Sequence, residues 1–135
     1  MARATVIYDA ACGLCRVCLA LLLVWDRRGA LRPLPLGTAE ADRLLADLVV
    51  ERRDASWHLV DESGRRNSAG AALAPALSLL PGGGGPAALV ARAPHLTERG
   101  YRWVADHRGR LGRLVPGAAR RWADRVIAAH GGPRS

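Results

Sequence analysis

All three cysteines of the chain fall within residues 12–18, at Cys12, Cys15 and Cys18. A Cys-x-x-Cys pair can close a disulfide with little backbone movement, and this spacing beside alternating strands and helices indicates thiol–disulfide chemistry. Cys12 and Cys15 are therefore the candidate redox pair. Cys18 comes one helical turn later, among apolar residues, and we expect it to be a buried core residue.

The segments around the cysteines set the chemical environment of Cys12. Residues 4–8 are a β-branched run that is typical of a buried strand, and residues 19–25 are a continuous apolar run with strong helix formers. Cys12 is thus predicted at a helix start, where unpaired N–H groups and the positive end of the helix dipole stabilise a thiolate. Cys15 would lie one turn deeper on the same face.

Two alternatives to a redox pair follow from the same cysteines. Zinc normally takes four ligands, whereas the chain offers three cysteines and its first histidine is His58. The cysteines could also be small buried hydrophobic residues in a non-catalytic interaction module. In such a module, a basic helix near the C-terminus would meet the partner. Stoichiometric zinc in the purified protein would favour the metal-binding interpretation.

The charge and hydropathy of the chain argue against several classes of function. The net charge is +8, but all 20 Lys and Arg positions are arginine and most are dispersed, so we attribute the charge to a compositional bias. No nucleic-acid-binding signature is present, which argues against a nucleic-acid partner. No apolar run reaches the ~18 residues of a membrane span, and residues 1–3 lead into the first strand without a secretory signal. We therefore expect a cytoplasmic protein with no membrane partner.

The patterns along the chain predict a single small α/β domain. The predicted strands cover residues 4–8, 31–36, 56–61 and 65–68, the last two as a hairpin. The predicted helices cover residues 12–25, 42–48, 71–80, 87–93, 98–107 and 118–129. The prolines of residues 31–36 place that strand at a sheet edge. Thr38 and Thr97 are predicted N-caps, residues 52–54 a polar connection and residues 81–86 a flexible break.

The motif around the cysteines resembles that of a known family. Tyr8-Asp9-x-x-Cys12-Gly13-x-Cys15, followed by an apolar helix, resembles the DCC family of thiol-disulfide oxidoreductases, which is also described as a domain of unknown function. The family name reflects the Asp-Cys-Cys pattern. The likeness covers about residues 4–112, with similar segments at residues 31–36, 57–65, 68–73 and 101–108.

This resemblance implies a fold and a mechanism. The fold would be a thioredoxin-like α/β sandwich, a small mixed sheet flanked by helices, over residues 1–112. A basic amphipathic helical tail would follow at residues 113–135. Cys12 would attack a disulfide of a protein or small molecule, and Cys15 would resolve the mixed disulfide. The chain has no cofactor motif, so electrons would come from a cellular thiol reductant.

The resemblance also points to residues beside the cysteines. Asp9 would be catalytic, moving a proton during exchange, or would order the loop as an Asx-turn. Thioredoxin-like folds usually carry a cis-proline before the strand that faces the cysteines, and Ser56 stands there instead. The residues expected to face a substrate are Tyr8, Gly13, Leu14 and Ser56. No metal is expected in a redox site of this kind.

Overall fold

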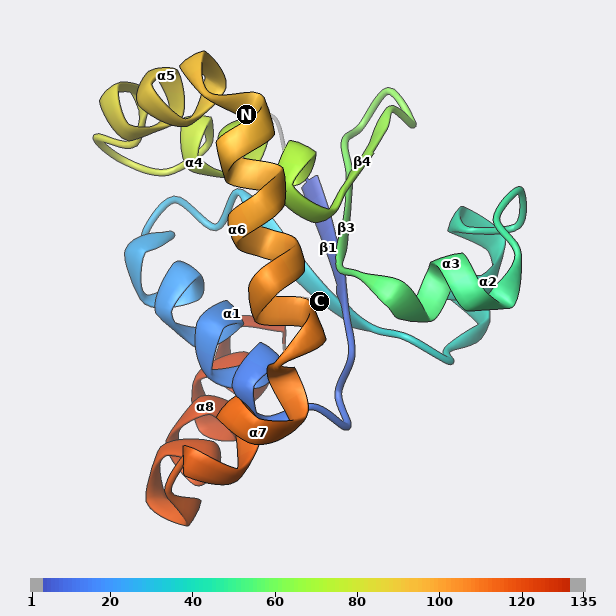
Figure 1. The fold of residues 1–135 in the computed structure, drawn as a ribbon, viewed down its shortest axis with the longest axis vertical. Coiled ribbons are helices and arrows are strands. Elements are labelled where there is room, and N and C mark those ends of the chain that lie inside the picture. The colour runs from blue at the N-terminus through green and yellow to red at the C-terminus, as the bar shows by residue number, and fades with distance from the viewer. Residues whose placement is uncertain (1–3, 132–135) are drawn as a thin grey trace.

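Four strands form one mixed sheet in the computed structural model, which describes residues 4–131 apart from the side chains of residues 50, 54, 55 and 131. The strands are β1 (Ala4–Tyr8), β2 (Leu31–Pro35), β3 (His58–Val60) and β4 (Arg66–Ser68). Their order across the sheet is β2-β1-β3-β4 (Figure 1). β1 is parallel to β2 and antiparallel to β3, and β3 is antiparallel to β4.

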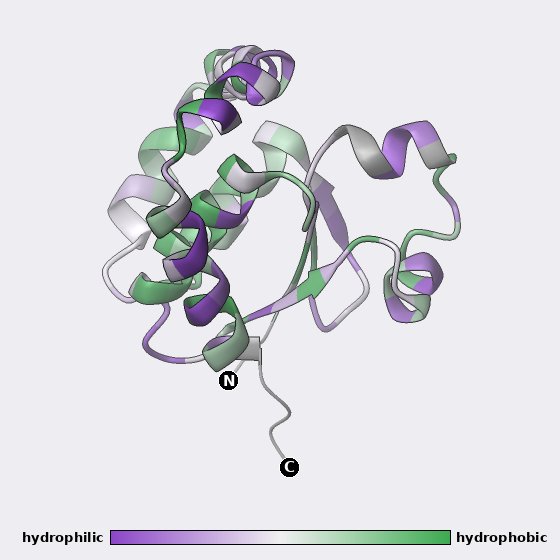
Figure 2. Cartoon of the chain, turned by 90° about the horizontal axis from the view of Figure 1, so that it is seen from below, coloured by the Kyte–Doolittle hydropathy of each residue, from purple (hydrophilic) through white to green (hydrophobic). Residues whose placement is uncertain are grey.

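Helices follow β1 and fill most of the remaining chain. They are α1 (Gly13–Trp25), α2 (Ala39–Leu44), α3 (Val50–Ala55), the 3-10 helix η1 (Ala69–Ala72), α4 (Leu73–Ser78), α5 (Gly84–Arg92), α6 (Pro94–Asp106), α7 (Arg108–Leu114) and α8 (Gly117–Gly131). Viewed from below, the sheet lies between a large group of helices and the small pair α2 and α3 (Figure 2).

The sheet separates two apolar cores because strand side chains alternate between its faces. Val6 faces the larger core, with Leu19 and Leu23 of α1. Ile7, the next residue, faces the smaller core, with Leu45. The side chains of Val6 and Ile7 are both fully buried, so β1 packs against the helices on both sides of the sheet. The α/β arrangement is consistent with the expected thioredoxin-like fold.

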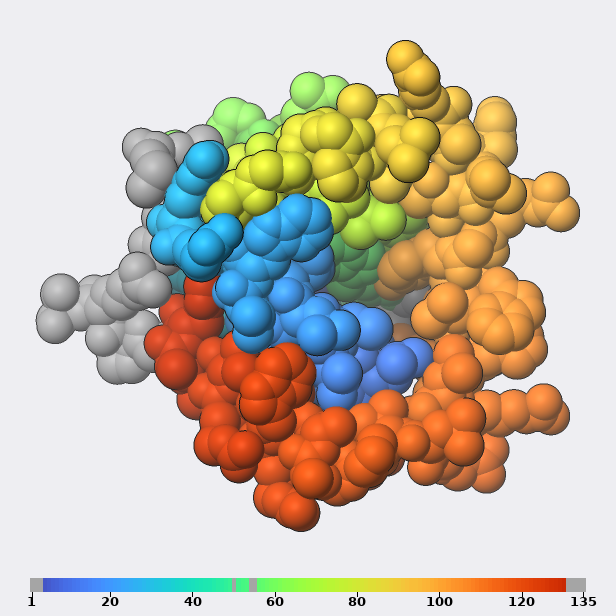
Figure 3. Space-filling model, turned by 90° about the vertical axis from the view of Figure 1, so that its left-hand side faces the viewer, coloured from blue at the N-terminus to red at the C-terminus, as the bar shows by residue number. Residues whose placement is uncertain are grey.

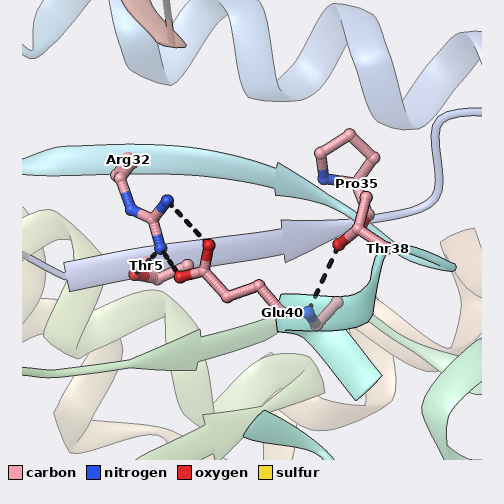
Figure 4. Close-up of polar contacts among 6 residues, drawn as sticks. Thr5, Arg32, Pro35, Thr38 and Glu40 are labelled. Atoms are coloured by element: carbon pink, nitrogen blue, oxygen red, sulfur yellow. Dashed lines mark hydrogen bonds and ion pairs between the residues drawn. The ribbon is translucent and has the colours of Figure 1, made fainter. Parts of the chain in front are cut away.

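The edge position of β2 is confirmed. Pro33 and Pro35 lie in this strand, and β1 is its neighbour in the sheet. A proline has no N–H to donate to a ladder, so prolines are tolerated at such an edge. Arg32, on the same strand, contacts the hydroxyl of Thr5 and forms an ion pair with Glu40 of α2 (Figure 4). This pair ties the second helical layer to the sheet edge.

Several expected helix limits differ from those observed. Thr38 is the N-cap of α2, accepting a hydrogen bond from the N–H of Ala41 at 3.3 Å (Figure 4), but α2 begins and ends earlier than predicted. The predicted polar connection at residues 52–54 is part of α3. The predicted break at residues 81–86 contributes its last residues to α5.

The N-cap prediction for Thr97 is wrong. Thr97 lies inside α6, which begins at Pro94, and its hydroxyl donates to the carbonyl of Ala93 at 2.9 Å. Proline supplies the helix start instead, because its fixed φ suits the first helical turn.

α8 packs along α1 and also contacts β2. Val126 and Ile127 of α8 pack against the larger core, and Ala123 is fully buried. Two polar contacts join the same helices: Arg16 pairs with Asp124, and His130 with Asp26. The division of the chain at residue 112 stays a prediction. Within residues 4–131, no helix has the length and apolar character needed to cross a bilayer.

Candidate active site

A tight turn links β1 to α1 and holds Cys12 at the helix start. The Oδ1 atom of Asp9 accepts a hydrogen bond from the N–H of Ala11 at 2.9 Å. The carbonyl of Asp9 accepts another from the N–H of Cys12 at 3.2 Å. The first bond is the side-chain contact that defines an Asx-turn, and the second is a backbone turn bond over the same residues. Asp9 therefore orders the turn that carries Cys12.

Cys12 is the N-cap residue of α1, as the sequence predicts. Its Sγ accepts a hydrogen bond from the N–H of Cys15 at 3.3 Å. The first N–H groups of a helix have no intrahelical partner, and they stabilise an acceptor placed before them. The sulfur of Cys12 thus occupies the position that a serine or aspartate oxygen takes at an ordinary N-cap.

Cys15 lies one turn further along α1, and its pKa is far above that of an exposed cysteine. Its pKa is raised to about 12, first by burial and then by the hydrogen bond with the Cys12 thiol. The Arg108 guanidinium opposes this shift. Cys15 consequently remains a protonated thiol at neutral pH, next to the sulfur of Cys12.

The prediction that Cys18 belongs to the core is wrong. Cys18 is exposed and lines a cavity together with Cys15. The reason is tertiary: α6 packs on η1, where the N–H of Gly70 donates to Glu98 at 3.0 Å, and leaves a hollow over this face of α1. Figure 3 shows the hollow between α1, in blue, and α6, in orange. Cys18 does lie on the helix at the predicted spacing, but no element of residues 4–131 covers it.

The cavity beside Cys15 has a volume of about 570 Å³ and a mainly apolar lining. Three of the four residues expected to face a substrate line it: Tyr8, Leu14 and Ser56. The Ser56 hydroxyl donates to the carbonyl of Trp57 at 3.1 Å. Burial raises the pKa of Tyr8, so its hydroxyl stays protonated. We refer to this cavity as the apolar pocket.

Tyr101 of α6 closes the far side of the apolar pocket. Its hydroxyl accepts a hydrogen bond from the N–H of Trp57 at 3.1 Å. Val104 and Ala105, on the same side of α6, also line the pocket. These three residues therefore share one face of α6, and that face is the pocket wall.

A second cavity, of about 320 Å³, opens on the other side of the turn and is lined by Cys12 and Gly13. Four arginines contribute to its wall: Arg16, Arg108, Arg113 and Arg120. We refer to it as the arginine pocket. Its presence could not be read from the sequence, because the arginines come from α1, α7 and α8. The one local signal was Arg16, a helical turn after Cys12.

The residues described in the structure contain no group of three or more His, Cys, Asp or Glu side chains arranged to hold a metal ion. The histidine nearest to the cysteines in sequence, His58, is buried on β3. Its ring contacts Ser68 Oγ at 2.6 Å and the carbonyl of Arg53 at 3.0 Å. Both ring nitrogens of His58 thus have a partner within the core.

Comparison with known proteins identifies a family and nothing closer. No curated protein and no solved structure matches the chain. The model of the family DCC1-like thiol-disulfide oxidoreductase matches residues 6–114. The matched region includes the cysteine turn, the sheet apart from the first two residues of β1, and the pocket walls formed by α6 and α7. The chain therefore belongs to the DCC1-like thiol-disulfide oxidoreductase family.

Proposed function

We propose that the protein exchanges disulfides through Cys12 and Cys15, with Cys12 as the attacking thiolate. The observation that carries this assignment is the hydrogen bond from the N–H of Cys15 to Cys12 Sγ, at 3.3 Å. Negative charge that develops on this sulfur meets the positive end of α1. Cys12 also borders the arginine pocket, so positive side chains lie beside the attacking sulfur.

Cys15 is the resolving thiol in this proposal. Its raised pKa, about 12, keeps its proton in place while Cys12 attacks. Cys12 forms a mixed disulfide with one substrate sulfur and the other leaves as a thiolate. Cys15 then gives its proton to that thiolate and attacks the sulfur of Cys12, so that the second substrate sulfur leaves as a thiolate. Two electrons pass from the dithiol to the substrate, and a cellular thiol reductant restores the pair.

The residues around the pair have supporting roles. Asp9 is a positioning residue, because its contacts order the turn before Cys12. Leu14, Tyr8 and Ser56 face the part of a protein or small-molecule substrate that enters the apolar pocket, and Gly13 faces the arginine pocket. We place this chemistry in the cytoplasm, where thiol systems maintain the reduced form.

A redox titration of the purified protein tests the proposal. The protein is equilibrated in glutathione buffers of graded potential, and its free thiols are alkylated and mapped by mass spectrometry. We expect one reversible disulfide, Cys12–Cys15, with Cys18 alkylated throughout. The midpoint gives the reduction potential and hence the direction of exchange. The absence of a reversible pair at every potential would refute the proposal.

A further inference from the structure

The arginine pocket brings an excess of positive charge to the attacking sulfur. Four arginines line it, and Asp9 is the one carboxylate in its lining within the described residues. Two of the arginines have an acidic partner: Arg16 pairs with Asp124 at 3.0 Å, and Arg108 lies 3.9 Å from Asp9. The charge of these two is therefore largely balanced.

The other two arginines bond to backbone oxygens, which do not neutralise them. Arg113 donates through Nε to the carbonyl of Gly109 at 3.4 Å, and Arg120 donates to that of Gly112. Arg120 lies directly over the helix start, because a Cβ added at Gly13 would stand 2.8 Å from its Nε. Two positive charges thus remain beside Cys12.

Part of this arginine cluster is also unsatisfied. Among the described side chains, Nε of Arg16 and Nε of Arg120 are buried and have no hydrogen-bond partner. A buried donor without a partner carries a free-energy cost, and an acceptor in the pocket would meet the outer N–H groups of these arginines rather than the buried Nε atoms. Carboxylates suit this position, because their two oxygens match the fork of donors on a guanidinium.

We propose that the arginine pocket binds the carboxylates of a small acidic disulfide and seats one of its sulfurs against Cys12. This inference names a substrate class for the proposed function and rests on it. The volume of about 320 Å³ lies at the lower end of the range for small-molecule sites, which suits a molecule of tripeptide size. Of the four arginines, only Arg108 also lines the apolar pocket, which therefore offers such carboxylates no comparable cluster.

The exchange balances in atoms and electrons. The Cys12 thiolate attacks one sulfur of the acidic disulfide, so that a Cys12–substrate bond forms, the substrate S–S bond breaks and the second half leaves as a thiolate. Cys15 then gives its proton to the half that has left and attacks Cys12, so that the first half leaves as a thiolate. The products are one thiol and one thiolate of the acidic substrate, together with the Cys12–Cys15 disulfide.

The charge beside Cys12 can be measured without any exchange. Iodoacetate is an anion and iodoacetamide is neutral, and both alkylate the thiolate. The rate with iodoacetate divided by the rate with iodoacetamide at one cysteine therefore reports the local electrostatic potential. With site-resolved mass spectrometry, we expect this ratio to be about tenfold higher at Cys12 than at Cys18, a preference of the size that electrostatic focusing produces. It should fall as the salt rises from about 10 to about 500 mM.

The substrate class is tested with three disulfides of different charge: oxidised glutathione, neutral hydroxyethyl disulfide and cationic cystamine. We expect oxidised glutathione to form the Cys12–Cys15 disulfide fastest. Arg113→Gln should reduce that preference several-fold. Arg99→Gln, which removes the same charge from an exposed site on α6 outside both pockets, should leave it unchanged.

The outcomes separate this inference from the function beneath it. Equal rates with all three disulfides, or an equal loss in Arg113→Gln and Arg99→Gln, would overturn the acidic-disulfide assignment while exchange itself stands. An iodoacetate preference no greater at Cys12 than at Cys18 would also overturn it. No exchange with any of the three disulfides would refute the proposed function and the substrate class together.

Discussion

His130, near the end of α8, donates a hydrogen bond through Nε2 to the buried carboxylate of Asp26 at 2.9 Å. The same carboxylate accepts the N–H of Ala30 at 2.9 Å and that of Leu31 at 2.8 Å. Asp26 caps the end of α1, and Leu31 opens β2. One carboxylate therefore fixes the helix that carries the cysteines, the edge strand and the C-terminal helix.

Replacing Asp26 with alanine should be strongly destabilising. The backbone donors of Ala30 and Leu31 would lose their partner in a buried position, and each such loss costs about 1–3 kcal/mol. We expect the free energy of unfolding, measured by urea denaturation, to fall by about 2–5 kcal/mol. The matched control is Asp124→Ala, which removes an exposed ion pair to Arg16 and should cost at most about 1 kcal/mol. Equal losses in the two variants would contradict the role of Asp26.

The two candidate catalytic cysteines should fail in different ways. Cys12→Ser removes the attacking sulfur, so disulfide exchange should fall to background. Cys15→Ser leaves the attack intact and removes the resolving thiol, so the mixed disulfide at Cys12 should accumulate. Mass spectrometry under non-reducing conditions distinguishes the two. A mixed disulfide at Cys15 in the Cys12→Ser variant, with full activity, would show that the attacking residue was misassigned.

The alkylation of Cys15 should depend steeply on pH. Burial, followed by the hydrogen bond with Cys12, holds the pKa of Cys15 at about 12, and the thiolate is the form that reacts. The rate should therefore rise about tenfold for each pH unit through the neutral and mildly alkaline range. Site-resolved initial rates with iodoacetamide measure this, with free cysteine under the same conditions as reference, because burial raises the pKa of Cys18 as well. A Cys15 rate that levels off near pH 8 would contradict the assignment.

The part of the site that the sequence could predict depends on local chemistry. Cys12 at the helix start follows from the strand before it and the apolar run after it, and Thr38 follows from the N-cap preference of its hydroxyl. Such features involve neighbours a few residues apart, so their types and spacing are enough. The arginine pocket cannot be predicted from neighbouring residues in this way, because Arg16 and Arg120 meet only after α8 packs along α1.

The apolar pocket was missed for a related reason. A helix face rich in apolar residues is normally buried, and Cys18 was assigned to the core on that basis. Whether such a face is covered depends on where a distant helix lies. Here Gly70 lets α6 approach η1 closely, since a Cβ at Gly70 would lie 2.9 Å from the Cα of Glu98, and α6 stands away from Cys18. The periodicity of the α1 sequence holds no information about how far α6 lies from Cys18.

Replacing Cys18 with serine should change neither exchange nor stability much. Cys18 is exposed at the apolar pocket, so the serine hydroxyl keeps access to water, and the cost should be below about 1 kcal/mol, as for most surface substitutions. The rate of Cys12–Cys15 disulfide formation should be within about twofold of the wild type, because Cys18 takes no part in the proposed steps. Urea denaturation and the exchange assay measure the two quantities on the same preparation. A loss of about 2 kcal/mol or more would instead fit a buried polar group, and an inactive variant of normal stability would mean that Cys18 itself takes part in exchange.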